Sequence, residues 1–314
     1  MDPFPELDED QRTAIAAEQA AVNERIREMG QALPPAGQVP LDLLRTRETG
    51  PSGEPLLVHP EAKDLIVPGP GGAPDVRVRV HPNAEAKALL IHVHGGGFVF
   101  GSPDHFDREL SALAAETGTE VLVPQWRLAP EHPHPAGRDD VAEVIGWAFD
   151  QTEQRDLRGV ILAGESAGAQ VALDAVLAQH RGDRRLLGLA LLFGFFDLSL
   201  SASARAWGDD HLVVNTPWLE WFLDQLLPGV GQAERTALSA INQDLTDLPH
   251  LQLMAGSADP LIDDTLDLAR ALTSAGVDHE LWLYPDAPHG FISHPTTIGR
   301  HATAKLNDFI RSLP

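Results

Sequence analysis

The 314-residue chain contains no cysteine, which excludes several kinds of chemistry at once. Disulfide bonds, a thiolate nucleophile, iron–sulfur clusters and thiolate zinc sites all need that residue. Long hydrophobic runs are missing as well: the longest near-continuous one, residues 186–196, has 11 residues, whereas a membrane-spanning helix needs about 20. The first ten residues carry five acidic side chains, the opposite of the basic start of a signal peptide. These absences predict a soluble, cytoplasmic protein without a membrane span.

Positive charge is scarce in this sequence. The chain holds 23 lysines and arginines against 46 aspartates and glutamates, which gives a formal net charge of −23 at pH 7. Such a surface repels nucleic acids and anionic membranes, so we expect neither as a partner. The acidic side chains are typical of a solvated surface that promotes solubility. The length is ample for one α/β domain with a full core.

Short apolar segments alternate with helical patterns from about residue 63 onward. We expect eight strands, at residues 64–67, 76–81, 88–94, 120–124, 159–163, 186–193, 251–254 and 280–284. We expect helices near residues 138–153, 167–181, 261–274 and 298–312. Strands that alternate with helices predict a mostly parallel sheet covered on both faces. Because no helix separates the first two strands, this edge of the sheet is expected to be antiparallel.

Two segments stand outside the alternation. Residues 8–30 have apolar side chains at helical spacing, which predicts an amphipathic helix with one face formed by Ile15, Val22, Ile26 and Met29. Residues 197–248 contain no strand-like run and are interpreted as a helical insertion between two strands. Four aromatic residues of the insertion either form a local core or line a substrate pocket: Trp207, Trp218, Trp221 and Phe222. The sequence leaves both interpretations open.

The sharpest chemical signal is the sequence Gly-Glu-Ser-Ala-Gly at residues 164–168. It follows a predicted strand and precedes a predicted helix, and this strand–turn–helix setting is typical of a nucleophile elbow. The turn is so tight that small residues, here Gly164 and Gly168, must flank the central Ser166. The helix that follows directs its positive N-terminal end at the serine, where it favours a developing oxyanion.

A second signal is His94-Gly95-Gly96-Gly97 at the end of a predicted strand. Three consecutive glycines are costly in backbone entropy. Their N–H groups, unobstructed by side chains, are suited to bind a substrate oxygen whose charge grows in the transition state. We therefore expect this loop to bind an oxyanion.

A serine hydroxyl becomes nucleophilic only when a base takes its proton and an acid orients that base. Asp259 and His289 each follow a predicted strand, at the carboxyl end where open α/β sheets carry their sites. Three other aspartates compete for the role of the acid: Asp263, Asp264 and Asp286. The first two lie in the next predicted helix and the third is more typical of a turn residue, so Asp259 is favoured.

Pairs of histidines are also candidates for metal binding. His92 and His94 share one side of a predicted strand, and His132 and His134 are two residues apart. A catalytic zinc site needs a third ligand and often a carboxylate, and the HExxH pattern is absent. We therefore expect no metal and no cofactor. Instead, His94 is expected to brace the glycine loop, and His132 and His134 to lie in a surface or mouth loop.

Together these blocks resemble a known family. Residues 94–102, HGGGFVFGS, are similar to the HGGGxxxGS signature of the bacterial hormone-sensitive-lipase-like esterases, which are α/β hydrolases. Residues 126–133, WRLAPEHP, are similar to the family's YRLAPEHP block, with Trp126 in place of tyrosine. The elbow and residues 259–261 and 289–291 match the remaining blocks, so the resemblance covers about residues 60–312. Two further residues differ: Glu165 replaces a common aspartate, and Ala169 replaces a common third glycine.

The resemblance implies an α/β-hydrolase fold, with a mostly parallel eight-stranded sheet flanked by helices and a helical cap. It implies an N-terminal cap segment at residues 1–45, a catalytic domain at 46–196 and 249–314, and a cap insertion at 197–248. Its motifs place a catalytic triad at Ser166, Asp259 and His289, and an oxyanion hole at the N–H groups of Gly95, Gly96 and Ala167. The candidate substrate-binding residues are Phe98, Trp218 and Trp221.

The same resemblance implies a serine carboxylesterase that hydrolyses short- to medium-chain acyl esters through an acyl-enzyme intermediate. A lactonase or an amidase with the same triad is an alternative. A non-catalytic small-molecule receptor on this fold is another, although such receptors replace the triad histidine, present here as His289. We expect a small-molecule ester as the substrate and, from the family, a homodimer formed through the last strand and helix.

Overall fold

The computed structural model describes residues 3–32, 34–46 and 58–314. Within these residues eight strands form one sheet: β1 (Lys63–Val67), β2 (Val76–His81), β3 (Ala88–Val93), β4 (Thr119–Pro124), β5 (Val160–Glu165), β6 (Leu186–Leu192), β7 (Leu251–Ala258) and β8 (His279–Pro288). Their order across the sheet is β1-β2-β4-β3-β5-β6-β7-β8. The β1–β2 and β2–β4 pairs are antiparallel and the other neighbours are parallel. The mostly parallel sheet and its antiparallel edge are thus confirmed.

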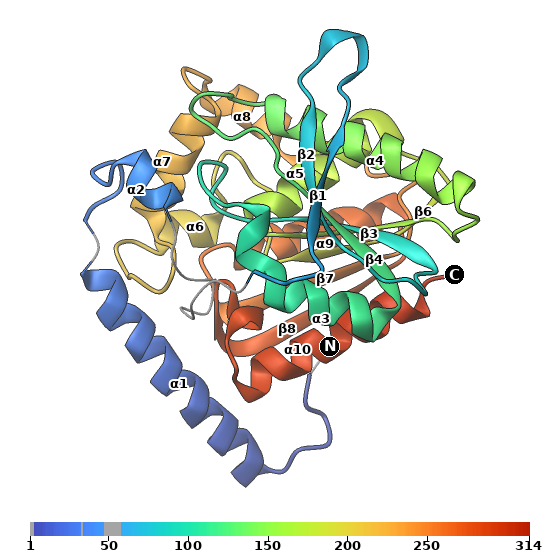
Figure 1. Cartoon of the computed structure of the whole chain (residues 1–314). Coiled ribbons are helices and arrows are strands. Elements are labelled where there is room, and N and C mark those ends of the chain that lie inside the picture. Colours follow the sequence, from blue (N-terminus) through green and yellow to red (C-terminus); the bar gives the residue numbers. More distant parts are fainter. Residues whose placement is uncertain (1–2, 33, 47–57) are drawn as a thin grey trace.

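Helices cover both faces of the sheet (Figure 1). One face packs against α3 (Asp107–Thr117) and α10 (Thr297–Ser312), and the other against α4 (Ala136–Gln154), α5 (Ala167–Ala175) and α9 (Ile262–Ala275). Every residue of β3 is buried, because helices cover a parallel sheet on both sides and its strands can be apolar throughout. The helix expected at residues 167–181 is present. It consists of α5 and a π-helical turn that follows it directly, η3 (Val176–His180).

Helix α3 was not predicted from the sequence. It connects β3 to β4 and buries Leu110, Leu113 and Ala114 against the sheet. These three apolar positions span little more than one turn, so the helical period is short and weak in the sequence. The helix matters for the site because it follows directly on η2 (Pro103–Phe106), whose side chains pack under the glycine loop.

The insertion between β6 and β7 is helical. It contains α6 (Ala202–Ala206), α7 (Thr216–Leu226) and α8 (Gln232–Leu238). On the same side of the molecule lies the short helix α2 (Leu41–Arg45), which belongs to the N-terminal segment (Figure 1). The two predicted cap segments meet there, since a Cβ on Gly37, just before α2, would lie 3.0 Å from Trp221 Nε1 on α7.

Helix α1 (Glu9–Gln31) runs as a long arm beside β8 and α10 (Figure 1). The apolar face predicted for it is only partly correct. Ile26 is buried, but Met29 is 58% exposed. The other buried residues of the helix are the polar Gln19 and Asn23, which an analysis of apolar spacing does not select. Among the described residues, no helix has the length and apolar character needed to cross a membrane.

Candidate active site

Ser166 occupies the sharp turn between β5 and α5. Its backbone has φ 53° and ψ −126°, a conformation that a residue with a side chain rarely adopts. The flanking glycines are required by close packing. A Cβ on Gly168 would lie 2.2 Å from the carbonyl oxygen of Val93, and one on Gly164 would lie 2.8 Å from the Cα of Ala169. The turn thus holds the serine side chain at the carboxyl end of the sheet.

His289 lies between Ser166 and Asp259. Its Nε2 is 2.8 Å from Ser166 Oγ, and its Nδ1 is 2.9 Å from Asp259 Oδ2. A carboxylate can only accept a hydrogen bond, so Nδ1 carries the proton. Nε2 of the neutral imidazole is then the acceptor that faces the serine hydroxyl. This arrangement equips the histidine to remove the serine proton.

Asp259 is completely buried, and its second oxygen, Oδ1, accepts the N–H of Leu261 at 2.8 Å. The imidazole of His289 packs edge-on against the ring of Phe193, with 5.1 Å between the ring centres. His289, the partner of the Ser166 hydroxyl, and Asp259 behind it are therefore each held by more than one contact. Such support keeps a catalytic geometry within the narrow range that reaction requires.

The three competing aspartates face other groups. Asp263 accepts the N–H of Ser203, and Asp264 accepts the N–H of Asp197, each from the start of the helical insertion. Asp286 has an exposed side chain on a turn with φ 55°. None of the three has a hydrogen bond to His289. The geometry thus favours Asp259 as the acid.

The glycine loop lies directly beside the elbow. A Cβ added to Gly95 would come within 3.2 Å of the Cβ of Ser166, and one on Gly96, with φ 122°, would lie 2.0 Å from the carbonyl oxygen of Phe100. In the described part of the chain, no backbone carbonyl accepts from the N–H groups of Gly95 or Gly96. Ala167 is the first residue of α5, so its N–H has no partner within the helix.

His94 supports this loop from below. Its Nδ1 lies 2.8 Å from the carbonyl oxygen of Gly95, and its ring stacks on Trp126 at 5.2 Å. Burial lowers the pKa of His94 to about 4 and that of His92 to about 3, so both are uncharged near neutral pH. The neutral His94 donates its Nδ1–H to the Gly95 carbonyl. Across the described residues, no three potential metal ligands gather.

A cavity of about 410 Å³ opens onto Ser166 and His289. The glycine loop forms one part of its wall. Apolar side chains from both segments outside the sheet form much of the rest: Ile26 and Met29 of α1, Leu219 and Phe222 of α7, and Val213 and Val214 before it. Phe193, Phe195 and Phe100 complete an aromatic side. The lining suits the hydrocarbon part of a small substrate.

The three predicted substrate-binding residues do not line this cavity. Phe98 is 1% exposed and packs on Phe195 in the core. Trp218 and Trp221 pack against each other and on the ring of Phe222, behind the cavity wall. Residues three apart share a face of a helix, so Leu219 and Phe222 line the cavity together, whereas Trp218 and Trp221 line up on the neighbouring face.

Phe222 is the residue that the prediction missed. Its ring lies so close to the glycine loop that a Cβ on Gly97 would be 2.6 Å from it. It also contacts Phe100, with 6.0 Å between ring centres. Its place among four aromatic candidates was visible in the sequence, but which face of α7 meets the cavity was not.

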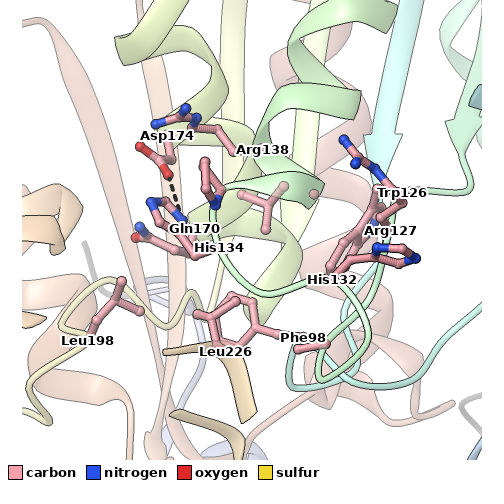
Figure 2. Close-up of a pocket in the computed structure, with 14 residues that line it drawn as sticks. Phe98, Trp126, Arg127, His132, His134, Arg138, Gln170, Asp174, Leu198 and Leu226 are labelled. Carbon is pink, nitrogen blue, oxygen red and sulfur yellow. Dashed lines mark ion pairs between the residues drawn. The ribbon is translucent and has the colours of Figure 1, made fainter. Parts of the chain in front are cut away.

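A second, much smaller cavity of about 20 Å³ lies behind the elbow helix (Figure 2). At one end Asp174 of α5 faces His134, with 3.6 Å between Oδ2 and Nδ1, and Arg138 and Gln170 lie beside them (Figure 2). His134 is thus a half-buried loop residue, and His132 lies at the opposite end of the cavity (Figure 2). Burial raises the pKa of Asp174 to about 6 and lowers that of His134.

This shift predicts a pH-dependent stability. The folded protein binds a proton at Asp174 more tightly than the unfolded chain, where the pKa is about 3.8. Proton binding at Asp174 therefore adds to the free energy of unfolding at low pH, and this contribution is lost as pH rises from about 4 through 6. Asp174→Asn removes the cost of the buried charge, so we expect it to stabilise the fold by about 1–3 kcal/mol at pH 8 and by little at pH 4.

Denaturant unfolding of both proteins at pH 4, 6 and 8 measures this difference. Asp183→Asn serves as the control, because its carboxylate is paired with Arg185 and its pKa is lowered. That control is expected to lose stability at pH 8. Equal effects of Asp174→Asn on stability at all three pH values would contradict a raised pKa of Asp174.

Comparison with known proteins agrees with this geometry. A family model described as alpha/beta hydrolase fold matches residues 90–293. The carboxylesterase NlhH of Mycobacterium tuberculosis is 30% identical over 75% of this chain and 77% of its own. An acetyl esterase of Salmonella paratyphi B is 29% identical over 74% and 73%. The structure of a hyperthermophilic esterase from Pyrobaculum calidifontis has a TM-score of 0.73, 25% identity and 98% coverage of both chains.

The fold and these matches define the class of protein: the chain belongs to the alpha/beta hydrolase fold family. Within that family it is a relative of the hormone-sensitive-lipase-like esterases, as its motifs predicted.

Proposed function

We propose that this carboxylic ester hydrolase acts on short- to medium-chain acyl esters, with Ser166 as nucleophile, His289 as base and Asp259 as the acid that orients it. One observation carries the proposal: His289 bonds Ser166 and Asp259 at once, at the bottom of an apolar cavity. The esterases among its relatives support the same reaction class.

The reaction follows from this geometry. Nε2 of His289 takes the hydroxyl proton as Ser166 Oγ bonds to the ester carbonyl carbon, and the carbonyl oxygen becomes an oxyanion. The C–O bond to the alcohol then breaks, and His289 gives its proton to the leaving oxygen. Water repeats both steps on the acyl-enzyme and releases the acid. Asp259 stays ionised and stabilises the imidazolium.

The oxyanion is bound by the N–H groups of Gly95, Gly96 and Ala167. Support comes from the position of the loop beside Ser166 and from the absence of backbone acceptors for the two glycine N–H groups in the described residues. Preplaced backbone donors contribute several kcal/mol to transition-state stabilisation. The N-terminus of α5, which begins at Ala167, adds a favourable dipole.

Residues 1–45 and 197–248 act as a cap over a catalytic domain of residues 46–196 and 249–314. Support comes from the cavity wall, to which α1 contributes Ile26 and Met29 and the insertion contributes Leu219 and Phe222. A wall on this side limits the length of the acyl chain. We therefore expect kcat/KM to rise with each buried methylene, by up to about fourfold, and then to decline.

Phe222→Ala tests which side chain sets this limit. Removing the ring enlarges the cavity, so we expect the optimum to move to longer acyl chains, with up to about a fourfold gain in kcat/KM for each newly buried methylene. The measurement is kcat/KM for p-nitrophenyl esters of graded acyl length. Trp207→Ala is the control, since Trp207 is in the same insertion but does not line the cavity. An unmoved optimum in Phe222→Ala would assign the limit to another residue.

Adding lactones and amides to this ester panel separates the alternative functions. A lactonase or an amidase hydrolyses lactones or amides with a higher kcat/KM than any ester in the panel. A receptor binds ligand and hydrolyses none of the substrates. Ester hydrolysis that depends on Ser166 supports the carboxylesterase, whereas a purified, folded protein inactive on all three classes would overturn it.

A homodimer and a cytoplasmic location complete the proposal. The dimer would form where β8 lies at the end of the sheet order and bonds to α10 through Tyr284 and His301. Sedimentation velocity measures its presence directly. Cell fractionation tests the location.

A further inference from the structure

Helix α1 buries two amide side chains, which is unusual for a helix whose surface is otherwise largely exposed. Gln19 is 1% exposed and Asn23 is 6% exposed. Burying an amide is unfavourable unless it finds hydrogen-bond partners. The two residues lie four apart, on one face of the helix, and with Ile26 they form its entire buried set. The hydrogen-bond partners of the two amides therefore indicate the role of this helix face.

The two amides form a short chain that ends on the loop of the catalytic histidine. Gln19 donates from Nε2 to Asn23 Oδ1 at 2.9 Å. Asn23 donates from Nδ2 to the carbonyl oxygen of Asp286 at 2.8 Å. Asp286 is only three residues before His289. Gln19 thus orients Asn23, and Asn23 binds the backbone that leads to the base.

The Asp286 turn depends on such support. Its φ of 55° lies in the left-handed region, which is unfavourable for a residue with a side chain. On one side its N–H donates to Ser257 Oγ at 2.8 Å, and Ser257 is two residues before Asp259. On the other side its carbonyl accepts from Asn23. The turn is therefore held between the segment that carries the acid and helix α1.

The same helix also reaches the cavity and the insertion. Ile26 and Met29, one and two turns beyond Asn23, line the cavity. Arg27 pairs with Asp210 of the insertion through Nε and Nη2, at 2.9 and 3.0 Å. One rigid element thus contacts the substrate wall, the insertion and the histidine turn.

We propose that Asn23, oriented by Gln19, is a positioning residue that holds the Asp286 turn and so sets the alignment of His289 between Ser166 and Asp259. The proposal rests on the proposed function and adds to it a second role for α1 besides lining the cavity. Docking of α1 then tunes the chemical step, whereas its apolar residues tune substrate binding.

Kinetics of Asn23→Ala and Asn23→Leu test the proposal. Both remove the donor, and the leucine keeps the side-chain volume. Because small displacements of a reacting group slow chemistry steeply, we expect kcat for a short-chain p-nitrophenyl ester to fall about 10- to 100-fold in both variants, with KM within about twofold. Gln19→Ala is expected to lower kcat less, and adding it to Asn23→Ala is expected to cause no further loss, because Gln19 acts through Asn23.

Glu18→Ala is the matched control. Glu18 also joins α1 to the body of the protein, by accepting the N–H of Thr297 at 2.9 Å, but it does not touch the histidine turn. We expect its kcat to stay within about twofold of the wild type. Thermal unfolding checks that each variant is folded at the assay temperature. If Asn23→Ala does not fold, Gln19→Ala still tests the proposal.

Three results would overturn the proposal: an unchanged kcat in both Asn23 variants, a kcat restored by leucine alone, or an equal loss in Glu18→Ala. The second would show that packing matters rather than the hydrogen bond, and the third that any loosening of α1 suffices. Failure of the proposed function is seen separately, as a wild-type protein that hydrolyses no ester or a Ser166→Ala variant that retains activity.

Discussion

Replacement of Ser166 by alanine is expected to lower kcat/KM for esters by about 10³- to 10⁶-fold. The hydroxyl oxygen is the atom that bonds to the acyl group, so the variant lacks the nucleophile. The change removes one oxygen and keeps the Cβ, so the unfavourable φ of 53° costs about the same with either residue. Far-ultraviolet circular dichroism and thermal unfolding verify the fold.

Ser274→Ala is the control for this experiment. Ser274 is exposed on α9, and its hydroxyl donates to the carbonyl of Arg270 one turn before it. Its variant should match the wild type in activity. If Ser166→Ala retained activity within about tenfold of the wild type, with contamination excluded, Ser166 would not be the nucleophile.

Asp259→Asn is expected to produce the second largest loss, about 10⁴-fold in kcat, as for the corresponding acid of serine proteases. Asparagine has nearly the same shape, but its amide group can donate to Nδ1 of His289. The imidazole then carries its proton on Nε2, where it faces Ser166 Oγ and cannot accept the serine proton. The measurement is kcat across pH 6 to 9 for the variant and the wild type.

Asp286→Asn is the matched control, because Asp286 was the competing acid closest to His289 in the sequence. Asparagine tolerates the left-handed conformation of this turn, and the backbone groups that bind Ser257 and Asn23 remain. We expect nearly full activity. A large loss here, together with a small one in Asp259→Asn, would reverse the assignment of the acid.

The sheet could be predicted from the sequence because its strands are short apolar runs separated by turns and helices. All eight predicted strands overlap observed ones. The largest differences are at the ends of β7 and β8, which run four residues further, to Ala258 and Pro288. There the pairing includes a register shift between Gly256 and Ala258, and such irregular pairing has no period-2 signature.

The triad and glycine loop could be located because tight backbone geometry restricts residue type. A Cβ at Gly168 would meet the backbone of Val93 and His94, so this position admits only glycine. The cavity wall could not be derived in that way. Leu219 and Trp218 are neighbours in an amphipathic helix, and only the docking angle of α7 decides which of them faces the substrate.

The polar contacts of α1 were missed for a related reason. The helical period of residues 8–30 rests on apolar residues alone, and such spacing does not select Gln19 or Asn23. Their burial depends on the carbonyl of Asp286, 263 residues away in the chain. Pairings over such a separation leave no local pattern. Such long-range contacts are recognised in the structure, where an amide side chain is buried on an otherwise exposed helix.

The absence of cysteine has a practical consequence at the cavity rim. Met29 of α1 is 58% exposed and Val213 of the insertion is 45% exposed, and both line the cavity. Since the chain has no native thiol, a single cysteine introduced at either position is the only site that a maleimide or a nitroxide reagent modifies. Doubly labelled protein then reports the spacing of the two cap segments in solution while ester is being turned over.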